Sequence, residues 1–298
     1  QEKATQYEGA YVKDPDLGLH KWIVSFDLNS LYPHLIMQYN ISPETYYDVK
    51  TNGVNVDNML SQQVNLKFAK DKNITIAPNG AMFRRDKQGF LPELMEKMYG
   101  DRVVYKKKMI EAKKEYEKTK DPIYKNEIAR CHNIQMAKKI ALNSAYGAIG
   151  NQYFRYFDVK QAEAITLGGQ LSIRWVERDV NKFMNKVLGT DNQNYVVASD
   201  TDSIYISMGK LVDKVCKDKT PQQIADFLDK VSEQKLQKII DGSFEHLADY
   251  VNAFEQKMVM KREAIANKGI WVAKKRYMLN LFDEEGIRYE YPKLKVMG

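Results

Sequence analysis

The chain has 298 residues, of which 44% are apolar, and its 46 lysines and arginines exceed its 39 acidic residues to give a formal net charge of +7. This apolar content can form a buried core and excludes a largely disordered chain, while the length fits one large domain or two smaller ones. Two cysteines do not make a disulfide framework, and no segment has the roughly 18 continuous apolar residues of a membrane span. The positive charge suits a polyanionic partner, although many basic proteins bind none.

The first ninety residues predict strands and loops around one short helix. Residues 21–27 (KWIVSFD) are rich in β-forming residues and end on an acid. Pro33 and Pro43 bracket an apolar stretch that favours a short helix. Residues 46–90 contain Asn-Gly and Pro-Asn-Gly sequences, which are typical of strands joined by turns.

The middle of the chain predicts three long helices. Residues 91–119 have a charged helical pattern, Asp121-Pro122 breaks it, and a second helix is expected over 123–147 with a glycine at its end. Two long helices joined by a short breaker pack as an antiparallel pair. A third helix is expected over 160–186.

The last third of the chain predicts a hairpin, helices and a second β-rich region. Residues 194–207 (NYVVASDTDSIYIS) form two β-rich arms around a tight turn, helices are expected over 210–256, and strands over 257–296. This order predicts an α+β fold, in which an antiparallel β-sheet is backed by helices and one antiparallel two-helix element protrudes.

Three acids are candidates for a metal site. Asp27 ends a predicted strand, and Asp200 and Asp202 flank the tip of the predicted hairpin. If the hairpin lies beside the strand, the carboxylates converge, and a divalent cation such as Mg²⁺ relieves their repulsion. A lone Asp-Thr-Asp is more often a turn stabilised by its own backbone bonds. Because a further acid lies at the strand end and basic helices are also predicted, we favour a metal site over a simple turn.

The predicted helical pair carries basic side chains at helical spacing. Arg102 and Lys106 share a face of the first helix, and Lys139, Asn143 and Tyr146 share a face of the second. An Arg, two Lys and an Asn projecting from paired helices suit a triphosphate. A solvated charged face has the same composition, which leaves the two interpretations equal.

Five segments, in order, resemble the motifs of family B (α-like) DNA polymerases. YEGA (7–10) resembles the motif between the exonuclease and polymerase regions, and FDLNSLYP (26–33) the first palm motif. KKIALNSAYG (138–147) is similar to the fingers-helix motif, SDTDSIY (199–205) to the second palm motif, and KKRY (274–277) to the primer grip. The flanking segments NISPET and YPKLKVMG are most similar to the corresponding sequences of replicative polymerases from T-even-type bacteriophages.

The resemblance implies a domain organisation, partners and a location. It implies a palm over 1–94 and 151–298 and a fingers hairpin over 95–150, without exonuclease or thumb domains, and therefore a polymerase core fragment. The implied partners are primer-template DNA and dNTPs, with separate exonuclease and thumb segments or a sliding clamp as further candidates and no membrane. The implied location is the cytoplasm of an infected bacterial host.

The resemblance also implies the roles of individual acids. Asp27 and Asp202 would hold two Mg²⁺ ions, with the Leu28 carbonyl as a further ligand. Asp200 would tune the site, and Glu263 would lie nearby without an essential ligand role.

The other residues implied by the resemblance bind substrates. Those expected to hold the dNTP are Ser30, Leu31, Tyr32, Arg102, Lys106, Lys139 and Asn143. Those expected to contact DNA are Tyr146, Gly147, Lys274, Lys275, Arg276 and Tyr277. Tyr32 would also act as a steric gate that excludes ribonucleotides, whereas from its position before Pro33 alone it fits equally well as a core residue.

The implied reaction is two-metal transfer of dNMP from a dNTP to a primer 3′-hydroxyl. One alternative is a catalytically incomplete DNA- and dNTP-binding half of a split polymerase. A second alternative is a two-metal nuclease, which uses clustered acids but needs no dNTP site. An RNA-synthesising enzyme is disfavoured by Tyr32.

Overall fold

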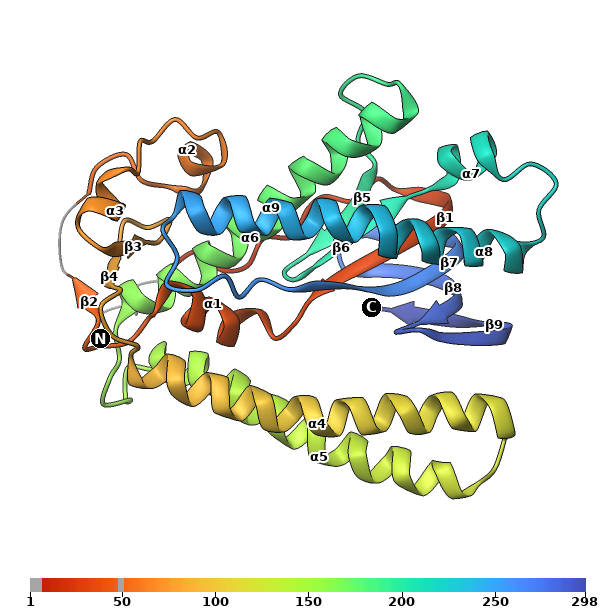
Figure 1. Cartoon of the computed structure of the whole chain (residues 1–298), viewed down its shortest axis with the longest axis horizontal. Coiled ribbons are helices and arrows are strands. Elements are labelled where there is room, and N and C mark those ends of the chain that lie inside the picture. Colours follow the sequence, from red (N-terminus) through yellow and green to blue (C-terminus); the bar gives the residue numbers. More distant parts are fainter. Residues whose placement is uncertain (1–6, 48–50) are drawn as a thin grey trace. The chain divides into compact units, whose positions relative to one another are not determined.

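A computed structural model describes residues 7–47 and 51–298 of the chain (Figure 1). The chain divides into two compact units. The first, called here the helical unit, contains Ser30–Ser172, Phe244–Met258 and the residues up to Ala10. The second, called here the sheet unit, contains Tyr11–Asn29, Ile173–Ser243 and Val259–Gly298.

The sheet unit is built on a six-stranded antiparallel sheet with the order β5-β6-β1-β7-β8-β9. Its strands are β1 (Gly18–Leu28), β5 (Val196–Asp200), β6 (Ser203–Ser207), β7 (Met260–Ala273), β8 (Arg276–Glu284) and β9 (Ile287–Met297). The predicted hairpin is β5–β6, and β6 pairs directly with β1. The α+β prediction is therefore confirmed.

Alternating apolar side chains of these strands form one core of the sheet unit. Ile23, Trp271 and Leu279 lie in it and are almost fully buried. Since successive side chains of a strand point to opposite faces, Val24, Phe26 and Ile265 lie on the other face, and they are fully buried as well. The helices that contribute to this unit are α6 (Val159–Leu188), α7 (Gly209–Val215), α8 (Pro221–Val231), a π-helical turn η1 (Ser232–Leu236) and α9 (Gln237–Tyr250).

The helical unit contains the predicted pair of long helices, α4 (Phe90–Thr119) and α5 (Ile123–Ile149), which lie side by side in Figure 1. Lys120 ends α4 in the left-handed conformation, and the chain returns after two further residues. The expected end of the second helix at Gly147 is wrong: α5 continues to Ile149 and is followed by Gly150. A glycine inside a helix destabilises it by about 1 kcal/mol relative to alanine, and this loss does not end α5.

The helical unit also contains the part of α6 up to Ser172 and the part of α9 from Phe244, and its other elements are short. α1 (Leu31–Tyr39) starts two residues before Pro33, because proline is tolerated in the first turn of a helix. A small sheet has the order β2-β4-β3. Its strands and neighbouring helices are β2 (Tyr46–Tyr47), β3 (Ile74–Ile76), β4 (Met82–Arg84), α2 (Val56–Leu60) and α3 (Phe68–Asp71). None of the helices formed by the described residues is sufficiently long and apolar to span a membrane.

Candidate metal and nucleotide site

Strand pairing brings Asp27 and Asp202 to the same end of the sheet. Asp27 is the second-last residue of β1 and lies opposite Ser203, the first residue of β6. The next backbone amide, that of Leu28, donates a 2.7 Å hydrogen bond to the carbonyl of Asp202. The hairpin therefore lies beside the strand, which was the condition for the two acids to converge, and their backbones are adjacent.

The turn between the two hairpin acids has an unusual backbone. Thr201 has a φ of 56°, a left-handed conformation that is rare for a β-branched residue. Its amide donates to the Tyr11 carbonyl at 2.9 Å, and its hydroxyl donates to Asp200 at 3.0 Å. These bonds hold the strained residue, and strain of this kind is concentrated at functional sites.

Asp200 is held differently from the other two acids. Its carboxylate lies 3.6 Å from the Lys275 ammonium, and its backbone forms an isolated bridge with Val12. Lys275 itself has a φ of 62°, so the β7–β8 turn presents this lysine in a fixed backbone conformation. Asp200 is thus paired with a lysine.

Asp27 carries an unsatisfied oxygen. Its Oδ1 is buried and finds no hydrogen-bond partner among residues 7–47 and 51–298. Burial raises the pKa of Asp27 well above its ordinary value, and the carboxyl groups of Glu263, within hydrogen-bonding reach, and of Asp202 raise it further. Ionised carboxylates only accept hydrogen bonds, so their approach is repulsive until a proton or a cation lies between them.

A hard divalent cation fits these residues. An orphaned carboxylate oxygen beside further acids is the donor set that Mg²⁺ takes together with water and phosphate oxygens. Within the described part of the chain, no three acidic, histidine or cysteine side chains form a cluster that could hold a metal by themselves. A cation would therefore also need oxygens from the backbone, water or substrate.

The KKRY segment lies in and after the β7–β8 turn. Lys274 pairs with Asp14 at 3.0 Å, and Arg276 begins β8. The Tyr277 ring is buried and stacks on Trp271 with centroids 5.5 Å apart, while its hydroxyl shares a 2.7 Å hydrogen bond with that of Tyr205. Sequence spacing could not show this, because alternation predicts a face but not a cross-strand partner.

In the helical unit, Arg102 reaches the start of α1. Its Nη1 donates to the Ser30 hydroxyl at 2.5 Å, and its Nε donates to Gln135 of α5 at 3.4 Å. Ser30 precedes α1 with a φ of 41°. The first amides of a helix, here those of Leu31 and Tyr32, have no acceptor within the helix and suit an anion such as phosphate. Gln135 was not predicted, since a buried glutamine carries no signal in the sequence.

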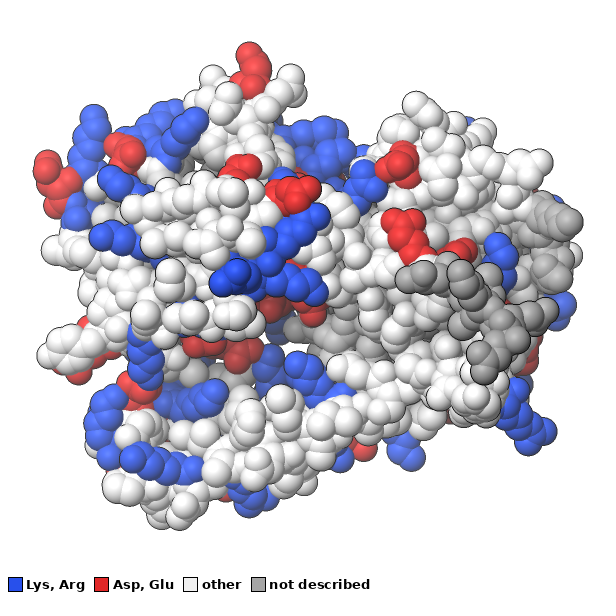
Figure 2. Space-filling view, turned by 180° about the vertical axis from the view of Figure 1, so that it is seen from behind, with Lys and Arg blue, Asp and Glu red and all other residues white. Residues whose placement is uncertain are grey.

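The other basic candidates follow the same two helices. Lys106 is half-buried on α4, one turn beyond Arg102, while Lys139 and Asn143 are exposed on α5. Lys and Arg side chains are spread along this helical pair, which is the lower lobe of Figure 2. This distribution fits a phosphate-binding surface, and it also fits a solvated face.

Tyr32 and Tyr146 are in contact. Their ring centroids are 4.6 Å apart, and the Tyr146 hydroxyl shares a 3.0 Å hydrogen bond with that of Tyr7. Burial, followed by the contact with Tyr7, raises the pKa of Tyr146. The YEGA segment was expected only as a linking motif, so the role of Tyr7 beside the α5 tyrosine was missed. Gly147 follows on an exposed part of α5, where an added Cβ would meet nothing.

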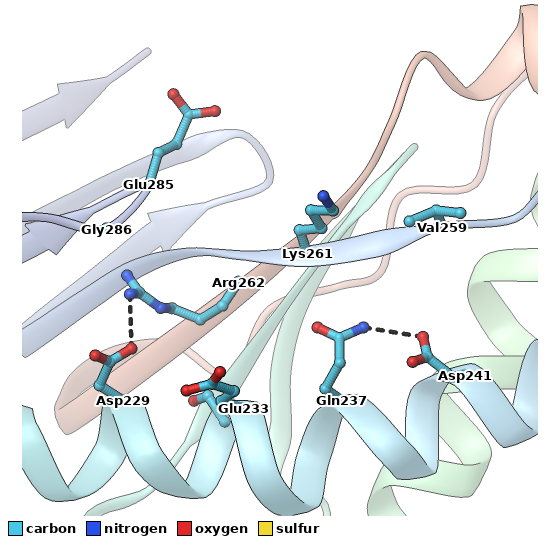
Figure 3. A pocket seen from close by; sticks show the side chains of 10 residues that line it. Asp229, Glu233, Gln237, Asp241, Val259, Lys261, Arg262, Glu285 and Gly286 are labelled. Carbon is cyan, nitrogen blue, oxygen red and sulfur yellow. Dashed lines mark hydrogen bonds and ion pairs between the residues drawn. The ribbon is translucent and has the colours of Figure 1, made fainter. Parts of the chain in front are cut away.

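A separate cavity of about 480 Å³ lies in the sheet unit between the α8–η1–α9 helices and β7 (Figure 3). Arg262 points from β7 to Asp229 of α8 and forms an ion pair at 2.9 Å, and Gln237 donates to Asp241 at 2.9 Å. Arg262 also pairs with Asp283. The Arg262–Asp229 ion pair connects β7 with α8 beside this cavity.

The sequence matches the model of DNA polymerase family B over residues 1–246. The chain belongs to DNA polymerase family B. Among relatives of this family, the DNA-directed DNA polymerases of Escherichia phage RB69 and Enterobacteria phage T4 are 35% and 33% identical over 98% of the chain. DNA polymerase 1 of Pyrococcus abyssi is 30% identical over 94% of it. The predicted family resemblance is thus confirmed.

The chain spans only part of these family B relatives. It covers 38% of the length of each phage polymerase and 28% of the archaeal one. The FDLNSLYP, KKIALNSAYG and SDTDSIY motifs lie inside the matched family region, and KKRY lies within the aligned part of the phage relatives.

Proposed function

We propose that this chain carries the palm and fingers of a template-directed DNA polymerase. The reaction is attack of a primer 3′-hydroxyl on the α-phosphate of a dNTP, with release of pyrophosphate. The observation that carries the proposal is the position of Asp27, with its unpartnered buried oxygen, beside Asp202. The phage relatives are named DNA-directed DNA polymerases, which supports the same reaction.

The sheet unit would supply the metal ligands. Asp27, Asp202 and the Leu28 carbonyl would hold two Mg²⁺ ions. When bound, such ions lower the pKa of the primer hydroxyl and neutralise the triphosphate. Asp200, which Lys275 already engages, would tune the charge of the site rather than ligate. Because ligation uses the unpartnered oxygen of Asp27, it would not break an existing hydrogen bond.

The helical unit would hold the nucleotide. The backbone of Ser30, Leu31 and Tyr32 would bind the triphosphate through helix-terminal amides. The fingers residues that would neutralise it are Arg102, Lys106, Lys139 and Asn143. The Arg102–Ser30 hydrogen bond supports this assignment, since it already brings a guanidinium to the start of α1.

Nucleotide selection and DNA contacts complete the proposed site. The Tyr32 ring, packed against Tyr146, would occupy the space that a ribose 2′-hydroxyl needs. The residues that would contact the nascent pair or the primer are Tyr146, Gly147, Lys274, Lys275, Arg276 and Tyr277. In this assignment Tyr277 would act from within the sheet, since its ring is buried.

The palm is assigned to 1–94 and 151–298 and the fingers to 95–150. The partners would be primer-template DNA and dNTPs, with exonuclease and thumb segments or a sliding clamp as further partners, in the cytoplasm of an infected host. A DNA- and dNTP-binding half of a split polymerase is a second candidate.

Primer extension tests the proposal. The purified chain is incubated with a primer-template, Mg²⁺ and dNTPs, and products are scored for lengthening and shortening. Lengthening that needs dNTPs and is lost in Asp202→Ala supports the polymerase. Extension only after exonuclease and thumb segments of a relative are added supports the split polymerase. Shortening without dNTPs, lost in the same variant, would instead identify a two-metal nuclease.

A further inference from the structure

Lys295 connects the last strand of the sheet to the acids of the proposed metal site. It lies on β9 opposite Leu279 of β8. Its ammonium is 3.5 Å from Glu263 of β7 and 3.6 Å from Glu284 of β8. The side chain is only 28% exposed, so water screens its charge less than that of a surface lysine.

Glu263 links this lysine to Asp27. The Glu263 carboxyl group lies within hydrogen-bonding reach of the Asp27 carboxyl group. Glu263 is also fixed through its backbone, since its carbonyl accepts a 2.7 Å hydrogen bond from the Glu285 amide. One acid therefore faces a fixed cation on one side and a proposed metal ligand on the other.

Lys295 and a divalent cation would compete for the Glu263 carboxylate. A half-buried carboxylate next to Asp27 is a natural further ligand for a divalent cation. A carboxylate already paired with an ammonium is a poorer ligand, because the cation must compete with the ion pair. The ion pair with Lys295 would thus make Glu263 unavailable as a metal ligand.

We infer that Lys295 is a positioning residue that acts as a built-in counter-cation: it holds Glu263 in an ion pair and so keeps this acid from ligating the metal. The inference rests on the proposed function, since it concerns the same metal site. In this inference, a lysine on a different strand is the reason why only Asp27 and Asp202 serve as acidic ligands. Divalent-cation affinity would then be set below the maximum that the local acids allow.

Mn²⁺ binding to the purified chain, measured by electron paramagnetic resonance without DNA or dNTP, tests the inference. Lys295→Met is expected to bind Mn²⁺ more tightly, on the order of tenfold, because Glu263 becomes available and one positive charge is lost. Lys295→Arg, which keeps the ion pair, should bind like the wild type. Lys268→Met, which removes an exposed lysine of β7, is the matched control.

A double substitution separates the inference from simple charge removal. In the Glu263→Gln background, Lys295→Met should lose most of its gain in affinity. Equal gains in both backgrounds, or unchanged or weaker binding in Lys295→Met, would overturn the inference. A destabilised site would weaken binding, so a purely structural role moves the result in the opposite direction. Lys295→Gln repeats the test if the methionine variant does not fold.

The same titration distinguishes failure of the inference from failure of the proposed function. If wild-type binding is lost in Asp202→Asn but Lys295→Met changes nothing, the metal site stands and the role of Lys295 falls. If the wild type binds no Mn²⁺, the proposed metal site and the inference are both refuted.

Discussion

Asp27 lies among like charges that its surroundings do not fully neutralise. Its pKa is raised by burial first and then by Glu263 and Asp202, and Lys295 opposes the shift only in part. A carboxyl group whose pKa is raised on folding favours the folded state when protonated. Its contribution is lost as the pH rises above the ordinary pKa of aspartate. Without a cation, ionised Asp27 therefore destabilises the fold at neutral pH.

Asp27→Asn should raise the stability of the metal-free chain while it abolishes synthesis. Removing the repelled charge is expected to increase the free energy of unfolding at pH 7 by roughly 1–2 kcal/mol, with a smaller gain at acidic pH. Thermal unfolding in chelator at both pH values measures this. Asp213→Asn, at an exposed acid of α7, is the control. A lower melting temperature for Asp27→Asn at pH 7 would contradict the account.

Tyr32→Ala should admit ribonucleotides. The ring now packs against Tyr146, and its loss leaves room for a 2′-hydroxyl where the ring was. The ratio of kcat/KM for dCTP over CTP is expected to fall by about tenfold or more, a loss of roughly 1.4 kcal/mol of discrimination. Tyr32→Phe keeps the ring and should keep the ratio. An unchanged ratio in the alanine variant would show that Tyr32 is a core residue only.

The helical pair positions its basic groups through contacts between elements. Arg102 leaves α4, passes Gln135 of α5 and ends on Ser30 before α1. Three elements thus fix one guanidinium, which lowers the entropy lost when it binds phosphate. Lys139 and Asn143 are exposed on α5 and have more freedom.

Arg102→Ala should lower kcat/KM for dNTP more than the loss of an ordinary ion pair on the same helical pair does. Losing a charge-assisted contact with the triphosphate is expected to lower kcat/KM for dNTP by about 10- to 100-fold, or roughly 1.5–3 kcal/mol. Steady-state single-nucleotide incorporation measures this. Arg130→Ala, which breaks an ion pair with Glu127 within α5, is the matched control. Equal effects of both variants would assign Arg102 to a solvated face.

Local signals in the sequence predicted the elements better than the contacts between them. The β5–β6 hairpin followed from the tight turn and the β-rich arms, whereas its position beside β1 was only assumed as a condition and is shown by the strand pairing. The end of α5 was misplaced, because Gly147 was taken as a helix stop when Gly150 follows the helix. The roles of Tyr7, Gln135 and Lys295 could not be predicted, since each depends on a partner set by strand register or helix packing.

At the scale of the whole molecule, two independent observations support the proposed polymerase function: family membership and the pair of acids Asp27 and Asp202. The match covers residues 1–246, and the relatives align with nearly all of the chain. The acid pair depends only on the geometry of the sheet unit. The two acids of the hairpin are not equivalent, because Asp200 is engaged by Lys275 while Asp202 adjoins the strand of Asp27.

Single-nucleotide primer extension by Asp202→Asn and Asp200→Asn, side by side in Mg²⁺, tests this central claim most directly. Loss of a metal ligand is expected to lower kcat by about a thousandfold or more in Asp202→Asn, whereas Asp200→Asn should lose much less. Equal losses in the two variants, or full activity in Asp202→Asn, would contradict the assignment of Asp27 and Asp202 as the metal pair.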